Sequence, residues 1–101
     1  MNIITKDGLT VTVQPNCDLT AQNIHELRDD LILLVGDFKT INIDFSHVDF
    51  IDSAGIGLLI STNNAITKLN HIMRVTNVSS DVIDMFKTMR LCSRFEVTGR
   101  I

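Results

Sequence analysis

Apolar and polar residues alternate along the chain with two different periods, which divide it into predicted strands and helices. A period of two, typical of strands, marks five short segments, residues 3–4, 9–13, 40–45, 72–76 and 95–98. In the clearest of them, TINIDF, isoleucine and phenylalanine alternate with asparagine and aspartate, so one side of this strand should face a core. The first two strands are separated by KDG, a short link containing glycine that favours a hairpin.

Three further segments repeat their apolar residues every three or four positions, which predicts helices. The first helix begins at a cap, either Asp18 or Thr20, and is followed by Gly36 as a C-terminal cap. Ser79 caps the third helix. The predicted buried face of that helix consists of Val82, Ile83, Phe86 and Met89.

The second helix is expected to run from Ser53 to about Leu69, with an apolar arc wider than one sheet contact requires. Two interpretations of this arc stay open. Part of it contacts a partner protein, or the helix is wedged between the sheet and a neighbouring helix.

Strands and helices alternate after the opening hairpin, which is the order produced by parallel strands joined through right-handed crossovers. We therefore expect an α/β fold, a mixed sheet of four to five strands with helices packed against it. The 101 residues fit one domain, residues 1–101. With 45% hydrophobic and 21% charged residues, the chain can bury enough surface to fold alone.

The charge distribution argues against nucleic acid as a partner. The net charge is −3, and the nine basic residues are scattered from Lys6 to Arg100 without a patch that could follow a phosphate backbone. No apolar run reaches the roughly 18 residues that a membrane span needs. The start, MNIITKDG, also lacks the regions of a signal peptide, so we expect a cytoplasmic protein without direct membrane insertion.

Cysteine and histidine positions do not suggest a metal site. Cys17 and Cys92 lack CxxC spacing and nearby ligands, which favours buried or idle thiols over zinc binding or a disulfide. His25, His47 and His71 fall in three different predicted elements, so we expect no shared metal ion.

The segment DFIDSAGIGLLI places an acid, a serine and two glycines in the most apolar part of the chain, but it fits no catalytic pattern. Ser53 lies outside a GxSxG motif, and no turn obviously aims His47 at it as a base. The pair Gly55 and Gly57 lacks the third glycine of a dinucleotide fingerprint, and there is no GxxxxGK[ST] segment. We therefore expect no enzyme activity, no catalytic residues and no cofactor.

A helix that begins at Asp52 or Ser53 leaves its first amides unpaired and carries a partial positive charge there. From the residues alone, Ser53 is either part of an ordinary helix cap or a phosphoacceptor. In the second case, Asp49 and Asp52 would add to the repulsion of an acidic partner. The glycines at this helix start either let a partner's backbone approach the serine or let the helix pack closely. Asp44 could orient the following loop or simply cap a turn.

The segment INIDFSHVDFIDSAGIGLLI resembles the central signature of the STAS domain, the family of bacterial anti-sigma factor antagonists. In that family, a strand ending in Asp-aliphatic-Ser precedes Asp-Ser-Ser/Ala-Gly at a helix start. The corresponding segments here are Asp44-Phe45-Ser46 and Asp52-Ser53-Ala54-Gly55. The helix LTAQNIHELRDDL and the joint VTNVSSDV match as well, so the resemblance covers nearly the whole chain.

The resemblance implies a non-enzymatic switch. A kinase-type anti-sigma factor would phosphorylate Ser53, a metal-dependent serine phosphatase would reverse this, and the unmodified protein would sequester the anti-sigma factor as a monomer or weak dimer. The partner-binding residues it implies are Asp18, Asp52, Ser53, Ala54, Gly55, Ile56, Gly57 and Leu58. The alternatives are a constitutive STAS module of a lipid-transport or other transporter complex, and a signalling scaffold.

The chain departs from the family pattern in two places. The sequence PNCD stands where a glycine commonly precedes the acid that opens the first helix, and TMRL stands where Thr-Gly-Leu is frequent. Because Arg90 lacks the freedom of glycine to adopt left-handed backbone, we expect the third helix to end differently.

Overall fold

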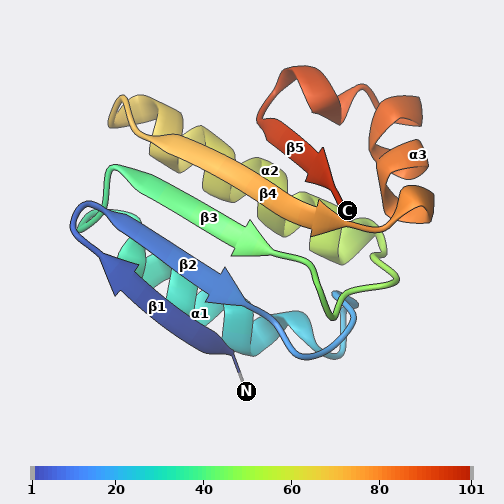
Figure 1. The fold of residues 1–101 in the computed structure, drawn as a ribbon, viewed down its shortest axis with the longest axis horizontal. Helices are drawn as coiled ribbons and strands as arrows, with labels where there is room; N and C mark the ends of the chain where they lie inside the picture. Colours follow the sequence, from blue (N-terminus) through green and yellow to red (C-terminus); the bar gives the residue numbers. More distant parts are fainter. Residues whose placement is uncertain (1, 101) are drawn as a thin grey trace.

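The computed structural model describes residues 2–100, which form a five-stranded sheet with strands in the order β1-β2-β3-β4-β5 (Figure 1). The strands are β1 Ile3–Asp7, β2 Thr10–Gln14, β3 Thr40–Asp44, β4 Ile72–Val78 and β5 Glu96–Gly99. β1 pairs antiparallel with β2, and the other neighbours pair in parallel. The expected α/β fold with a mixed sheet is therefore confirmed.

Three helices and one short 3₁₀ turn connect the parallel strands. They are α1 Ile24–Leu34, α2 Ser53–Lys68, α3 Ser80–Thr88 and η1 Leu91–Ser93. Figure 1 shows α1 and α2 behind the sheet, with α3 beyond the end of β4. None of the helices within residues 2–100 is both long and apolar enough to span a bilayer.

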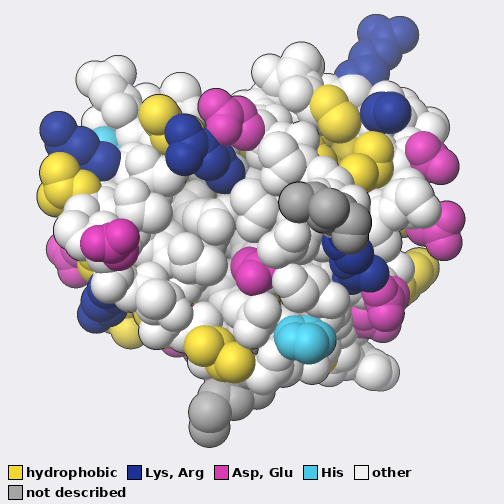
Figure 2. Space-filling model, viewed as in Figure 1, with side chains coloured by type: hydrophobic (Ala, Val, Ile, Leu, Met, Phe, Trp, Pro, Cys, Tyr) yellow, Lys and Arg dark blue, Asp and Glu magenta, His cyan; other side chains and the backbone are white. Residues whose placement is uncertain are grey.

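The core lies between the sheet and the helices because alternate strand residues point to one face. The fully buried strand side chains include Val11, Val13, Ile41, Ile43 and Val75, and Phe45, directly after β3, is fully buried as well. Phe86 of α3 joins this core, with its ring centroid 6.4 Å from that of Phe45 and 6.0 Å from that of Phe95. The opposite face of the sheet is open, and Figure 2 shows it to be mainly uncharged polar side chains and backbone.

The first helix begins later than predicted. Neither Asp18 nor Thr20 caps it, because α1 starts at Ile24 after a turn in which the Thr20 carbonyl accepts the amides of Asn23 and Ile24. Gly36 does follow the end of α1, directly after the C-cap residue Val35, but its φ is not positive. The carboxylate of Asp18 is used elsewhere, at the start of α2.

The hairpin and the third helix also differ in detail from the prediction. β1 ends at Asp7 and β2 begins at Thr10, so the turn consists of Gly8 and Leu9. Gly8 has a φ of 60°. Ser79 caps α3 as expected, its hydroxyl accepting the Val82 amide, but Met89 is 47% exposed and does not belong to the buried face.

Two expectations about single residues were wrong. Arg90 adopts the left-handed conformation that was expected to require glycine, with φ 59° and ψ 33°, directly after the end of α3. Of the two interpretations considered for Cys17 and Cys92, buried or idle thiols, burial is wrong, because both side chains are exposed.

Candidate functional site

The start of α2 is joined to the loop before α1 by backbone pairing. The Leu19 amide donates to the Phe50 carbonyl and the Asp52 amide donates to the Leu19 carbonyl, each at 3.1 Å. Leu19 and Ile51 form an isolated parallel bridge and are both fully buried. The loops after β2 and β3 are therefore held side by side, and Ser53 follows directly from this junction.

Two carboxylates strengthen the junction. Asp18 Oδ1 accepts the amides of Asp49 and Phe50, at 2.9 and 3.1 Å. Asp52 Oδ2 accepts the Ala21 amide at 3.0 Å from the opposite loop. Each loop thus supplies one carboxylate to the amides of the other, which fixes the position of the helix start.

Asp52 is also the N-terminal cap of α2. Its Oδ1 accepts the amides of Ala54 and Gly55, at 2.9 and 3.1 Å. Hydrogen bonds from the amides of Ala21, Gly55 and Ala54 stabilise the charged carboxylate and lower the pKa of Asp52 below its usual value of 3.8, outweighing the effect of burial. The capping role that the sequence left open between Asp52 and Ser53 belongs to Asp52.

Ser53 is the first residue of α2 and its side chain is exposed. No group within residues 2–100 makes a hydrogen bond with its hydroxyl. Since Asp52 already caps the helix, the hydroxyl is not needed to complete the local structure. It is an accessible hydroxyl at this end of the domain.

The two glycines of α2 have different surroundings. Gly55 is buried, and a Cβ atom there would lie 2.5 Å from the Leu19 carbonyl oxygen and 2.6 Å from Ile51 Cγ1. At Gly57 a Cβ atom would meet nothing within 4 Å, and the residue is exposed. Gly55 therefore serves close packing inside the protein, and Gly57 leaves open space beside the helix.

The implied partner-binding residues are not equally accessible. Ser53 and Gly57 are exposed, whereas Asp18, Asp52 and Ala54 are half-buried. Gly55, Ile56 and Leu58 are buried, and the two apolar side chains belong to the core. A partner could reach the exposed positions directly, while the buried ones hold the surface in place.

Sequence reasoning missed Phe50. Its side chain is 52% exposed in the loop just before Ser53, although its backbone is fixed by Asp18 and Leu19. Exposed aromatic rings held on rigid backbone are frequent anchors of protein interfaces. The available signal was an aromatic residue next to an acidic one in the loop segment SHVDF.

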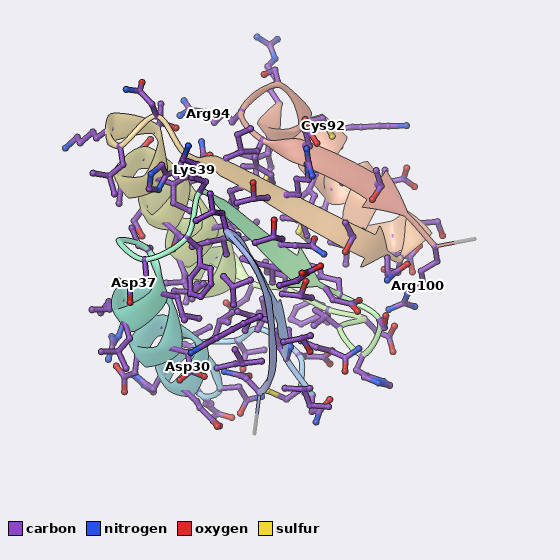
Figure 3. The ribbon with its side chains drawn as sticks, turned by 60° about the vertical axis from the view of Figure 1, so that its left-hand side comes forward. Asp30, Asp37, Lys39, Cys92, Arg94 and Arg100 are labelled. Atoms are coloured by element: carbon purple, nitrogen blue, oxygen red, sulfur yellow. The ribbon has the colours of Figure 1, made fainter. Side chains whose placement is uncertain are left out.

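A second residue missed from the sequence, Arg100, clamps the loop that leads to Ser53. Its guanidinium donates to the carbonyls of Phe45 and Val48 at 2.8 and 3.0 Å, to the Asn77 carbonyl at 3.0 Å, and to the Asp49 carboxylate at 3.0 Å. Figure 3 shows Arg100 where the strands end. Only the tertiary fold brings residue 100 to this loop.

Asp44 caps the turn at the end of β3. Its Oδ1 accepts the amide and hydroxyl of Ser46 and the side-chain amide of Asn77, and its Oδ2 accepts the side-chain amide of Gln14. Burial raises the pKa of Asp44 more than any single hydrogen bond lowers it, but these bonds together hold the pKa below 3.8. This agrees with turn capping, the second of the two roles considered for Asp44.

The structure brings together no group of three or more metal-ligating side chains in its described part. The side chains of Arg100 and Asp18 are engaged with loop backbone and the Asp49 carboxylate with Arg100, so the site is a fixed protein surface around the Ser53 hydroxyl. Its chemistry is that of a hydroxyl beside carboxylates at the N-terminus of a helix.

A protein-family model described as the STAS domain matches residues 1–100. No curated protein sequence matches the chain.

Solved structures with the same fold include anti-sigma factor antagonists and a domain of an anion transporter. An anti-sigma factor antagonist from Mycobacterium paratuberculosis matches with a TM-score of 0.85 at 17% identity, over 97% of this chain and 84% of that one. The phosphorylated form of the Bacillus cell fate determinant SpoIIAA matches with a TM-score of 0.76 at 18% identity, over 96% and 90%. The murine anion transporter Slc26a9 matches with a TM-score of 0.78 at 21% identity, over 96% of this chain and 17% of that one. At these identities the likeness shows a shared fold.

Proposed function

Because the chain belongs to the STAS domain family, we propose that it is an anti-sigma factor antagonist whose binding to a kinase-type anti-sigma factor is controlled by phosphorylation of Ser53. The observation that carries this proposal is the free, exposed hydroxyl of Ser53 at the first residue of α2, beside a cap supplied entirely by Asp52. The protein acts in the cytoplasm by binding, without catalysis of its own.

The local hydrogen bonds explain how a phosphoryl group could act here without refolding the domain. It would add about −1.5 to −2 charges at neutral pH. The amides of Ala54 and Gly55 already donate to Asp52, so they are not free to absorb this charge. The phosphoryl oxygens would therefore face outward, where they repel an acidic partner surface.

The unmodified protein offers that partner a matched set of contacts. Ser53 and Gly57 are two exposed positions about one helical turn apart, and Phe50, three residues before Ser53, supplies an aromatic anchor. The charge of a phosphoryl group on Ser53 would prevent the partner from binding this surface, and removal of the phosphate by a metal-dependent serine phosphatase would restore binding. The cycle would switch the anti-sigma factor between bound and free.

The test begins with the mass of the protein purified from its native cells, with fragmentation to locate any phosphate. We expect phosphate on Ser53 and its loss in Ser53→Ala. Ser61 is the matched control because it lies two turns along the same helix, but its hydroxyl donates to the Leu58 carbonyl. A Ser61→Ala protein should carry the same phosphate as the parent. An unmodified Ser53 across all growth conditions would contradict the switch.

Binding measurements then test the electrostatic part. With the kinase-type partner, Ser53→Ala should bind like the parent, and Ser53→Asp should bind at least tenfold more weakly because of its charge. Phe50→Ala should also weaken the complex if the ring is an anchor. Calorimetry measures all three, and parent-like affinity of Ser53→Asp would show that charge is not the switch.

The second candidate function is a constitutive binding module of a transporter complex, which the fold shared with the Slc26a9 transporter favours. It predicts an unmodified Ser53 and a transporter partner that Ser53→Asp still binds. Affinity capture with parent and Ser53→Asp baits separates the two functions.

A further inference from the structure

β1 is an edge strand of the sheet, paired with β2 on one side only (Figure 1). In an antiparallel pair, residues that exchange backbone hydrogen bonds with the neighbouring strand alternate with residues whose backbone groups point away from it. The turn closes on the hydrogen-bonded pair Asp7 and Thr10, so the amides and carbonyls of Ile4 and Lys6 point outward. These groups are available to a further strand.

The opposite edge of the sheet is less suited to such pairing. β5 has four residues, and its pairing with β4 is interrupted by a register shift between Val75 and Val78. Irregularities of this kind disturb the regular hydrogen bonding that a further strand requires. β1 has five residues, all paired with β2 in one unbroken register, and is therefore the more regular edge.

The β1 edge also exposes apolar side chains. Ile4 lies opposite Val13, which is fully buried on the helix side of the sheet, yet Ile4 itself is 39% exposed. Asp30 of α1 accepts a hydrogen bond from the side-chain amide of Asn2 at 2.7 Å, so this side of α1 runs beside β1. Leu33 lies three positions later on the same side of the helix and is 73% exposed. Ile4 and Leu33 thus add an apolar stripe to the unpaired backbone groups.

Charges of opposite sign stand at the two ends of this stripe. Lys6 lies near the turn, with its ammonium 5.9 Å from the centre of the Phe38 ring, and forms no ion pair with a described residue. Asp30 lies at the other end, beside Asn2, and has no cationic partner within residues 2–100. An antiparallel copy of the same edge presents these two charges in reverse order. The edge is therefore complementary to itself about a two-fold axis.

We propose that β1 pairs antiparallel with β1 of a second copy of the chain, which joins the two five-stranded sheets into one continuous sheet. The two-fold axis passes beside Ile4, so Ile4 faces its own copy and exchanges backbone hydrogen bonds with it. Lys6 then lies opposite Asn2 of the second copy and pairs with Asp30 there. By symmetry this ion pair forms twice.

The interface is small, because it consists of one strand pair, a short apolar stripe and two ion pairs. Interfaces at the low end of the size range bind weakly, so we expect a dissociation constant of about 100 µM. The proposed contacts include no residue of the loops around Ser53, which follow β2 and β3. The dimer therefore goes beyond the proposed switch and does not depend on it.

The test measures the oligomeric state of the full chain by sedimentation equilibrium from about 10 µM to about 1 mM. We expect mainly monomer at the lowest concentration and mainly dimer at the highest. In amide NMR over the same range, concentration-dependent shifts should centre on residues 2–8 and 30–33. A chain that stays monomeric throughout, or shifts centred on the open sheet face, on β5 or between α1 and α2, would overturn the proposal.

A charge reversal distinguishes this dimer from a general apolar association. Lys6→Glu places like charges at both ends of the strand pair and should weaken dimerisation at least tenfold. The double variant Lys6→Glu with Asp30→Lys exchanges the two charges and should recover most of the lost affinity. Lys87→Glu on α3 is the matched control, because it changes the net charge by the same amount away from β1.

The amide spectrum of each variant establishes that its monomer is folded. Parent-like dimerisation of Lys6→Glu, or no recovery in the double variant, would contradict the proposed ion pair. In a mixture of isotope-labelled and unlabelled chains, magnetisation should pass between the Ile4 methyl groups of the two copies, and its absence in a dimeric sample would contradict the register. Ser53→Ala and Ser53→Asp should dimerise like the parent, so the dimer and the proposed switch are tested separately.

Discussion

At the scale of single residues, the start of α2 depends on how much space each backbone position has. Gly55 and Gly57 stand two positions apart, yet one is pressed against Leu19 and Ile51 and the other faces open space. Ser53 is free to react because Asp52 takes over the capping role. The same residue types therefore serve packing at one position and accessibility at another.

The glycines give a matched pair of variants. Gly55→Ala should lower the free energy of unfolding by about 1 to 3 kcal/mol, because the added methyl group overlaps the Leu19 carbonyl and Ile51. Gly57→Ala should raise it by about 0.5 to 1 kcal/mol, because alanine favours a helix interior. Urea unfolding of both variants measures this. Equal effects of the two substitutions would contradict the packing role of Gly55.

Arg90 is a second residue under local constraint. A non-glycine residue in the left-handed region is unfavourable by roughly 1 to 2 kcal/mol. Arg90→Gly should therefore stabilise the domain by about 0.5 kcal/mol after the extra freedom of glycine in the unfolded chain is counted. Arg94, at φ −92°, is the control, and Arg94→Gly should destabilise. In thermal unfolding, Arg90→Gly should raise the midpoint temperature and Arg94→Gly should lower it. A loss of stability in Arg90→Gly would contradict the strain at Arg90.

At the scale of elements, α2 is anchored by charge as well as by packing. Its first turn contains no acidic residue after the cap, so Asp52 is the group that meets the partial positive charge of the helix start. The same carboxylate holds Ala21 in the loop before α1. Protonation of Asp52 would weaken both connections together.

The pH dependence follows from the lowered pKa of Asp52. A carboxyl group whose pKa is lower in the folded than in the unfolded state stabilises the folded state. The full stabilisation is present above the ordinary pKa of 3.8, and it is lost as the pH falls through the lower pKa of the folded state. Asp52→Asn should thus be less stable than the parent near neutral pH, and the difference should shrink below pH 3.8. Urea midpoints across this range measure the change, and a constant difference at every pH would refute it.

Asp44 supplies the control for this experiment. The pKa of Asp44 is also lowered, so the Asp52→Asn variant should keep part of the acid sensitivity of the parent. The double variant with Asp44→Asn should lose still more of the pH dependence.

At the scale of the whole molecule, the C-terminal end of the chain closes the candidate site. Arg100 joins the end of β4, through the Asn77 carbonyl, to the loop that follows β3. The loop before α1 is joined to the same loop through Asp18 and Leu19. The surface around Ser53 is therefore held from both sides by distant segments.

Removing the Arg100 clamp should loosen this surface selectively. Arg100→Met should lower the free energy of unfolding by about 2 kcal/mol and speed amide exchange most at residues 46–52, because three carbonyls lose a charged donor. Arg100→Lys should restore the charge but not the forked geometry, and so recover only part of the loss. Arg94→Met is the control. Exchange that increases evenly over the whole sheet would show that Arg100 does not act on the loop.

The order of strands and helices, the α/β class and the placement of Ser53 at a helix start could all be predicted from the amino-acid sequence. These features depend on side-chain period and on capping groups within a few residues, which are readable along the chain. The late start of α1 escaped prediction because Asp18 bonds to amides 31 and 32 residues away.

The contacts of the remaining site residues became visible only in the folded domain. The overlap at Gly55 and the clamp of Arg100 on a carbonyl 55 residues away each depend on neighbours brought together by folding. Residue spacing carries no record of such contacts, because packing distances are set by how the sheet and helices meet in space.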